Sequence, residues 1–269
     1  MILEQVPLDQ IVARRRAKID ALRVRCFSWE HERAAAAGIA YRLREGHAEI
    51  GYALVAGESR LVEFAVESAW RGRTSEAFEE AVAKLSVREI DVRTDDGLAL
   101  EAALAFASKQ RWDARPAAPI YALETGVLQR PPRPEGAEVR ALGADQAAAA
   151  TALLAEDSAI EPPLRDAEAV ARAAGSERLW GLYRGGELAG VALGVPLAAH
   201  RYVAIRPAIR AAHRRKGLAT YLVGEVSHAL LLANRRLVAE AQALDRGPRR
   251  IAEHLGLTLA AHELRVRKL

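Results

Sequence analysis

Apolar residues recur along the second half of the chain with two different periods, and these periods predict an order of strands and helices. Residues 137–142 alternate between apolar and polar positions, as a half-buried strand does. Further on, apolar residues recur every four positions on one face of a predicted amphipathic helix: Leu218, Leu222, Val226 and Leu230. The whole pattern predicts strands over 137–142, 178–197 (a pair), 201–209, 236–244 and 257–269, and helices over 144–157, 161–175, from 218 onward and over 246–256.

Glycine and proline interrupt this pattern at three places. Arg184-Gly185-Gly186 is the predicted turn within the strand pair. Pro207 lacks the N–H group that a sheet ladder uses, so it predicts a bulge or an edge at that point of its strand. Pro248 lies near the first turn of a predicted helix, where the missing N–H group costs little.

A proline-rich segment divides the chain into halves of similar size. Residues 128–138, LQRPPRPEGAE, carry three prolines and a glycine without apolar periodicity, which is typical of a linker. We therefore expect one domain over residues 1–130, a linker over 131–136 and a second domain over 137–269.

The two halves also resemble each other in sequence. Two pairs of segments match in the same order and at nearly the same offset: 61–78 with 203–222, and 106–112 with 251–257. In the first pair, Arg71 is aligned with Arg214, which places Thr74 on Gly217. Repeated order of this kind predicts a duplicated domain, in which each half forms a similar series of strands and helices.

Composition narrows the class of protein without naming its function. The chain has 269 residues, of which 51% are hydrophobic and 28% charged, as in globular domains with a sizeable core. Its formal net charge is +4 and its sequence pI about 9.4, and the cations are nearly all arginine. Acidic residues are interleaved with these arginines, so the charge pattern argues against a dedicated nucleic-acid-binding arm.

Other features exclude several classes of site. Cys26 is the single cysteine, so the chain forms no intrachain disulfide and no multi-cysteine metal site, and a reducing cytoplasm suits it. We also expect no metal, because the sequence has no HExxH or paired histidine cluster. No apolar stretch reaches the roughly 18 residues of a membrane-spanning helix, and residues 1–16 lack the pattern of a signal peptide.

The strongest candidate for chemistry is the basic turn at residues 211–222, AAHRRKGLATYL. A turn that leads directly into a helix leaves several backbone N–H groups unpaired, and the helix dipole adds partial positive charge there. Gly217 has no side chain, so a phosphate group approaches the backbone closely, and Arg214 and Lys216 add charged donors. These properties predict a site for a phosphate or pyrophosphate. A solvated basic turn that merely begins a helix is the alternative.

The string Arg214-Arg215-Lys216-Gly217-Leu218-Ala219 resembles the Arg/Gln-x-x-Gly-x-Gly/Ala signature of the GNAT N-acetyltransferase superfamily. The ending AEHLGL, residues 252–257, is similar to the Tyr-Glu-Lys-Leu-Gly-Phe that often follows in that family. The resemblance covers residues 137–269 well and the first half faintly. It implies a mixed α/β fold, here in tandem, with a splayed sheet flanked by helices in each domain.

The resemblance also implies a cofactor and a reaction. Backbone N–H groups of residues 215–219, including those of Arg215, Leu218 and Ala219, would hold the pyrophosphate of acetyl-CoA, and the strand end at Ile209 would pair with its pantetheine arm. An amine of a small molecule or peptide would attack the thioester directly. Such chemistry needs a base, for which Glu240 is the candidate in this sequence, with an outward-facing strand carboxylate as the alternative.

Both halves depart from the family pattern. In the predicted alignment, Thr74 replaces the key glycine of the turn and Glu76 replaces Ala219, so we infer that the first half has lost coenzyme binding. In the second half, Ala252 stands where the family often has a tyrosine acid. Non-catalytic acyl-CoA binding therefore stays open as a function, nucleic-acid binding is the less expected alternative, and monomer or homodimer both remain possible.

Overall fold

The structure is a computed structural model that describes residues 1–123, 127–157, 160, 162–197, 201–240 and 245–269. In the first half, the strands are β1 (Ile2–Val6), β2 (Ile39–Glu45), β3 (Ala48–Ala56), β4 (Arg60–Val66), β5 (Glu89–Arg93) and β6 (Asp113–Ala122), and the α-helices are α1 (Val12–Ala21), α2 (Trp29–Ala36), α3 (Thr74–Lys84) and α4 (Gly97–Gln110). In the second half, the strands are β7 (Ala137–Ala141), β8 (Leu179–Arg184), β9 (Glu187–Pro196), β10 (Tyr202–Ile209), β11 (Arg236–Glu240) and β12 (Thr258–Arg267), and the α-helices are α5 (Ala147–Ala155), α6 (Ala167–Ala174), α7 (Leu218–Leu232) and α8 (Arg246–His254).

These elements confirm the predicted fold class, with small differences at their ends. The predicted helix over 161–175 is shorter in the structure, because two prolines at its start form the 3-10 turn Pro162–Leu164 and α6 begins only at Ala167. The predicted strand over 236–244 is described as far as Glu240, and residues 241–244 lie outside the described part of the chain.

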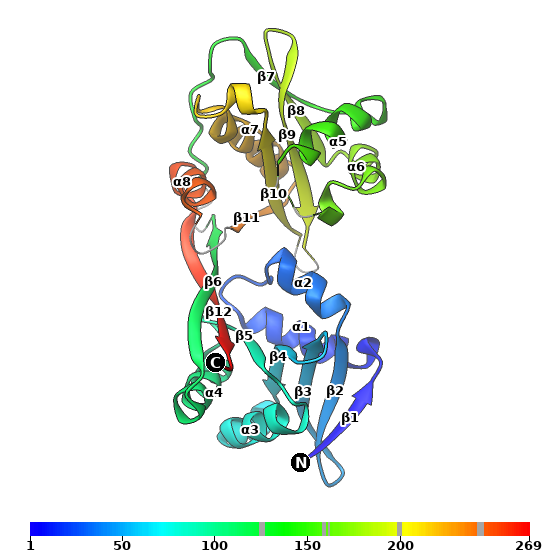
Figure 1. The fold of residues 1–269 in the computed structure, drawn as a ribbon, viewed down its shortest axis with the longest axis vertical. Coiled ribbons are helices and arrows are strands. Elements are labelled where there is room, and N and C mark those ends of the chain that lie inside the picture. The colour runs from blue at the N-terminus through cyan, green and yellow to red at the C-terminus, as the bar shows by residue number, and fades with distance from the viewer. Residues whose placement is uncertain (124–126, 158–159, 161, 198–200, 241–244) are drawn as a thin grey trace.

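Each half repeats one architecture, an antiparallel run of strands that ends in a splayed parallel pair (Figure 1). In the first half, β4 pairs with β5 only near their starts, at Arg60 and Leu61. In the second half, β10 pairs with β11 only as far as Ala204. Pro207 lies beyond that point, where β10 has left β11, so its missing N–H group removes no bond from that ladder. On its other side Pro207 is paired with Ala192 of β9, so β10 is open at this point only on the side that faces β11.

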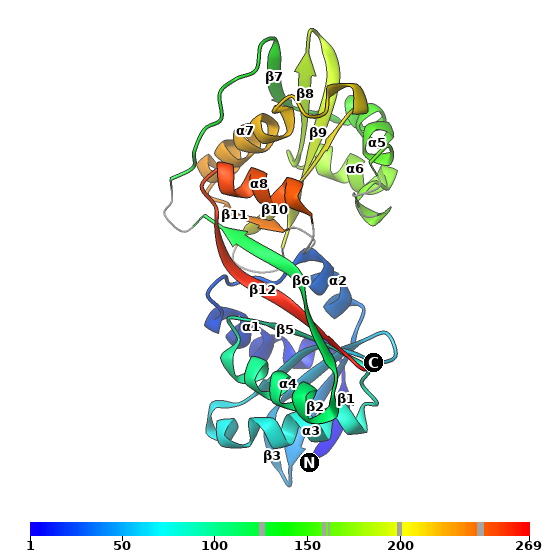
Figure 2. The same cartoon turned by 60° about the vertical axis from the view of Figure 1, so that its left-hand side comes forward.

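The two halves exchange strands. The described strands form one sheet with the order β1-β2-β3-β4-β5-β12-β6-β11-β10-β9-β8-β7. The last strand of the chain, β12, therefore lies between β5 and β6 of the first half, and β6 lies between β12 and β11. Figures 1 and 2 show β6 and β12 as two long strands that connect the upper and lower parts of the molecule. Neither half has a complete sheet of its own, so the proposed boundary at 131–136 separates two copies in sequence only.

A shared core reinforces this exchange. Val24 and Cys26, between α1 and α2, pack with Tyr202, Ala204 and Val238 of the second half. Cys26 is fully buried, and burial raises the pKa of its thiol, so it acts as a small apolar residue. The first half therefore forms part of the surroundings of β10 and β11, the strands that diverge in the second half.

Candidate active site

The divergence of β10 and β11 opens an apolar slot in the second half. The slot is bounded by these two strands and by α7 and α8, with the lining side chains Pro207, Val223, Ala239, Ile251 and Ala252 among others. Two polar residues also line it, Ser227 of α7 and Glu240 of β11. A narrow apolar slot of this kind suits the uncharged arm of a ligand.

Helix α7 begins at the same end of β10. The strand ends at Ile209, a 3-10 turn covers Ala211–His213, and α7 begins at Leu218 (Figure 1). Gly217 has a φ of 74°, a region that glycine adopts at little cost, and a Cβ atom there would meet nothing within 4 Å. No described side chain caps α7, and its first turn contains no acidic residue. The start of α7 therefore offers unpaired N–H groups and positive potential to an anion.

The cationic side chains of the turn donate hydrogen bonds to the backbone of the same loop. Arg214 Nε donates to the carbonyl oxygen of Ile209 at 2.9 Å, and Lys216 Nζ donates to that of Ala212 at 2.9 Å. Arg214 Nη2 also lies 3.6 Å from the Asp157 carboxylate. Arg214 and Lys216 are nevertheless exposed, so both remain accessible to an incoming anion.

The other predicted turn residues lie in the same place and differ in burial. Arg215 is exposed and has a φ of 61°, which is unusual for a side chain other than glycine. Leu218 is buried in the core, so only its backbone is available to a ligand, whereas Ala219 is half-buried. The structure thus brings residues 209–219 together at one end of the slot. It places Glu240 apart from them, on the slot's other bounding strand.

Glu240 is a buried carboxylate with both oxygens engaged. Its Oε1 accepts a hydrogen bond from the Trp29 backbone N–H at 3.0 Å, and its Oε2 accepts one from Arg206 Nη2 at 2.5 Å. Burial raises the pKa of Glu240 above its ordinary value, against the opposing effect of Arg206. A carboxylate with a raised pKa is a better base than an exposed one. The outward-facing alternative is wrong, because the side chain is buried where α2 meets the second half.

The first half has a different arrangement at the corresponding turn. Thr74 begins α3, whereas Gly217 precedes α7, so the structure pairs Thr74 with Leu218 and shifts the predicted alignment by one residue. Glu76 lies in the first turn of α3, where Arg73 binds both of its carboxylate oxygens, at 2.9 and 3.0 Å. The first turn of α3 therefore holds an ion-paired carboxylate, whereas the first turn of α7 contains no acidic residue.

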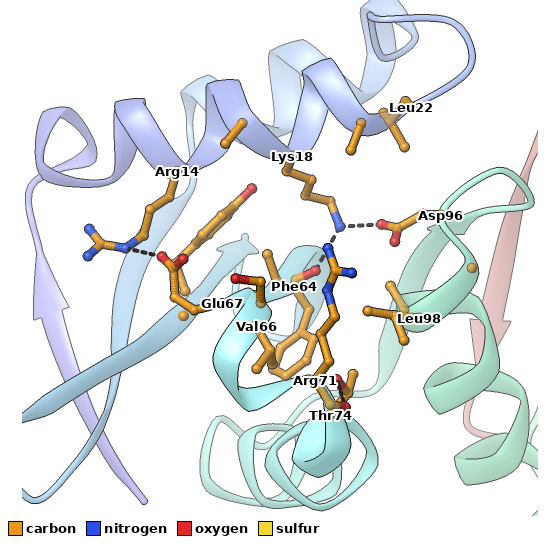
Figure 3. Close-up of a pocket in the computed structure, with 18 of the residues that line it drawn as sticks. Arg14, Lys18, Leu22, Phe64, Val66, Glu67, Arg71, Thr74, Asp96 and Leu98 are labelled. Carbon is orange, nitrogen blue, oxygen red and sulfur yellow. Dashed lines mark hydrogen bonds and ion pairs between the residues drawn. The ribbon is translucent and has the colours of Figure 1, made fainter.

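A lysine also bridges the splay of the first half. Lys18 Nζ, from α1, donates to the carbonyl oxygen of Phe64 on β4 at 2.7 Å and pairs with Asp96, which precedes α4 (Figure 3). The carbonyl oxygen of Phe64 is therefore already occupied by a side chain of the protein itself. The two diverging strand pairs thus have similar backbones but different polar side chains around them.

The sequence analysis missed a buried network in the first half. Glu63 of β4 is 2% exposed and accepts hydrogen bonds from Arg15 Nε at 2.7 Å and from the Tyr52 hydroxyl at 2.8 Å, with His31 Nε2 at 3.2 Å. Burial alone would raise the pKa of Glu63, but His31 and Arg15 lower it to about 2. Glu63 has two apolar residues on its N-terminal side and three on its C-terminal side in the strand RLVEFAV, and a carboxylate among apolar residues was the available signal.

The lowered pKa of Glu63 predicts a dependence of stability on pH. Because its folded-state pKa lies below its unfolded value, the ionised carboxylate stabilises the fold above about pH 4.5 by roughly 3 kcal/mol, and this is lost as pH falls toward 2. Thermal unfolding of Glu63→Gln should therefore occur well below that of the wild type at pH 7, with the gap narrowing to less than half by pH 3. Glu58→Gln, at an exposed position, should show no such gap. An equal gap at both pH values would contradict the assignment.

A splayed sheet, an uncapped helix start and an apolar slot together would suit a ligand with an anionic group and an apolar arm. Residues 148–256 match the model of the acetyltransferase (GNAT) family, whereas a search of curated proteins finds no match to the sequence. Residues that could hold a metal do not cluster in the described part of the chain, and none of its helices is long and apolar enough to cross a membrane.

Solved structures share this fold over the whole chain. An acetyltransferase from the GNAT family from Colwellia psychrerythraea has a TM-score of 0.85 at 12% identity, with 100% of each chain covered. A GCN5-related N-acetyltransferase from Sphaerobacter thermophilus has a TM-score of 0.66 at 18% identity, with 99% of this chain and 95% of that chain covered. A tandem GNAT protein from the clavulanic acid biosynthesis pathway has a TM-score of 0.59 at 14% identity, with 99% and 98% covered.

Residues 148–256 thus carry a GNAT-family domain, and the chain as a whole has the fold of GNAT proteins, with two such folds in tandem. At these identities the likeness to the solved structures is one of fold. The predicted family, fold class and type of enzyme are confirmed.

Proposed function

We propose that the second domain binds acetyl-CoA and transfers its acetyl group to an amine of a small molecule or peptide. The observation that supports this most is the joint placement of two sites, the uncapped start of α7 and the apolar slot, at the divergence of β10 and β11. The pyrophosphate would bind the N–H groups of residues 215–219, with Arg214 and Lys216 as charged partners. The pantetheine arm would enter the slot beside the end of β10.

The reaction is a direct transfer. The amine nitrogen attacks the thioester carbonyl carbon, a carbon–nitrogen bond forms, and the carbon–sulfur bond breaks with its electron pair remaining on sulfur. The amine loses one proton and the thiolate gains one. We assign Glu240 as the group that accepts the amine's proton, through water, because its carboxylate lines the slot and burial raises its pKa.

This assignment predicts the effect of Glu240→Gln. The amide oxygen can still accept from one of the two donors, Arg206 or the Trp29 N–H, but the amide NH2 accepts from neither and the group cannot take up a proton, so kcat should fall by about a hundredfold. The Kd of acetyl-CoA should change little. Thiol release during turnover with a panel of amines measures the rate, and calorimetry measures the binding. Glu253→Gln on α8, at a solvent-exposed carboxylate, is the matched control. Full turnover by Glu240→Gln would rule out this role.

Non-catalytic acyl-CoA binding is the second candidate, and two observations favour it. Ala252, at the position of the family's frequent tyrosine, is buried and lines the slot without a proton to offer. Glu240 is also held in an ion pair. Calorimetric titration of acetyl-CoA into the wild-type protein, followed by the amine screen, separates the functions. Binding with turnover supports the enzyme, binding without turnover supports the second candidate, and the absence of binding contradicts both.

A further inference from the structure

The first half contains a cavity of about 790 Å³ that the proposed acetyl transfer does not use. It lies between α1, the end of β4 and the starts of α3 and α4 (Figure 3). Small and apolar side chains form much of its wall: Ala13, Ala17, Leu22, Val66 and Leu98. Cavities of this volume accommodate small organic molecules.

The charged side chains around this cavity are neutralised with one exception. Three ion pairs account for most of them: Lys18 with Asp96, Arg14 with Glu67, and Arg93 with Asp95. Arg71 also lines the cavity, and it has no acidic partner among the residues that the structure describes. Figure 3 shows its side chain extending from the 3-10 turn Ser68–Arg73, which precedes α3, into the cavity and toward α1. The wall thus presents one uncompensated guanidinium group to the interior.

The backbone of Arg71 is fixed although its guanidinium group is free. The Thr74 hydroxyl donates a hydrogen bond to the carbonyl oxygen of Arg71 at 2.8 Å. Near the start of α7, by contrast, the guanidinium of Arg214 binds the end of its own strand at Ile209. Arg71 makes no such contact, so its donors remain available to a ligand.

The start of α4 adds to the positive potential. Gly97, Leu98 and Ala99 form the first turn of this 14-residue helix, and all three line the cavity. No described side chain caps the helix, and Lys18 neutralises the nearby Asp96. Unpaired N–H groups in this turn therefore reinforce Arg71 in attracting an anion.

We propose that this cavity is a second ligand site, which binds a small organic anion through Arg71. The ligand carries one carboxylate or phosphate group, bound by the guanidinium, and an apolar body that packs against α1 and Leu98. This ligand is distinct from the coenzyme, because Lys18 already bonds to the carbonyl oxygen of Phe64 in the splay and the Glu76–Arg73 ion pair lies in the first turn of α3. The site does not depend on the function proposed for the second domain.

Benzoate and phenyl phosphate are suitable probes, because each joins one anionic group to an apolar ring. Calorimetric titration into the full chain should show binding of at least one, and comparing the two distinguishes a carboxylate from a phosphate ligand. Arg71→Gln should weaken that binding at least tenfold, and Ala17→Phe, which fills the cavity, should abolish it. Arg88→Gln makes the same change at an exposed position outside the cavity and should leave binding unchanged.

Titration with acetyl-CoA tests whether this site differs from the proposed coenzyme site. Its binding should be the same in Arg71→Gln as in the wild type, and saturating acetyl-CoA should not displace the bound probe. The proposal is overturned if neither probe binds, if Arg71→Gln binds as tightly as the wild type, or if acetyl-CoA competes with the probe. None of these results bears on whether the second domain acetylates an amine.

Discussion

A chain that ends at Leu257 is expected to lose the cooperative fold of the first half, although all residues of that half are present. The missing strand, β12, pairs with β5 over Glu263–Arg267 and with β6 along its whole length. Its removal would expose both neighbouring strands and delete Val266, which is fully buried in the first-half core. Loss of one buried aliphatic side chain costs about 2–5 kcal/mol, and the whole stability of a domain is about 5–15 kcal/mol.

The truncation also removes charges that the first half uses. Arg265 pairs with Asp91 at 3.0 Å and with Glu89 at 3.2 Å, and both of these acids lie on β5. Circular dichroism during heating should show no cooperative transition for the first half of the truncated chain. A chain that lacks only Leu269, which is 90% exposed, is the matched control and should melt like the wild type. Two independent, cooperative transitions in the chain ending at Leu257 would show that the strand exchange is dispensable.

The second large effect concerns coenzyme binding at the start of α7. Thr220→Glu introduces a carboxylate at the position that Glu76 occupies in α3. Like charges about 4 Å apart in a partly screened setting repel by several kcal/mol, so acetyl-CoA should bind at least about a hundredfold more weakly. Thr220→Gln has the same shape without the charge and should bind nearly as the wild type does. Calorimetric titration of acetyl-CoA measures both.

Gly217 tests the backbone of the same turn. Gly217→Glu adds a charge and forces a side chain into the positive-φ region, so it should abolish measurable coenzyme binding. Gly46→Glu is a matched control, because Gly46 also has a positive φ, of 57°, and open space around its Cβ position. It lies in a first-half turn, so it should lose some stability and retain coenzyme binding. Equal loss in the two variants, or wild-type affinity in Thr220→Glu, would place the coenzyme elsewhere.

Local sequence patterns predicted the helices and strands, because the interactions that form these elements act between nearby residues. The four-residue apolar repeat that begins at Leu218 became the buried face of α7, and Gly217 became the residue before that helix. A basic segment ahead of a helix implies an anion site for reasons that depend on a few neighbouring residues. The alignment error at Thr74 was also local, since matching letters cannot show at which residue a helix begins.

The polar contacts between distant segments could not be predicted from the sequence. Glu240 was identified as a candidate base, but its bonds to Arg206 and to the Trp29 backbone depend on how α2 packs against the second half. The guanidinium group of Arg71 is free because no acidic side chain among the described residues pairs with it in the folded chain. Such properties depend on burial and on partners far away in the chain.

The sequence by itself determined a duplicated α/β chain with a GNAT-type fold and a basic, glycine-containing turn before α7 in the second copy, because periodicity and turn chemistry act over a few residues. Only the tertiary structure decided that β6 and β12 are exchanged between the copies. Strand pairing joins residues more than a hundred positions apart, and an apolar, alternating strand fits either neighbour equally well until the complete sheet is formed.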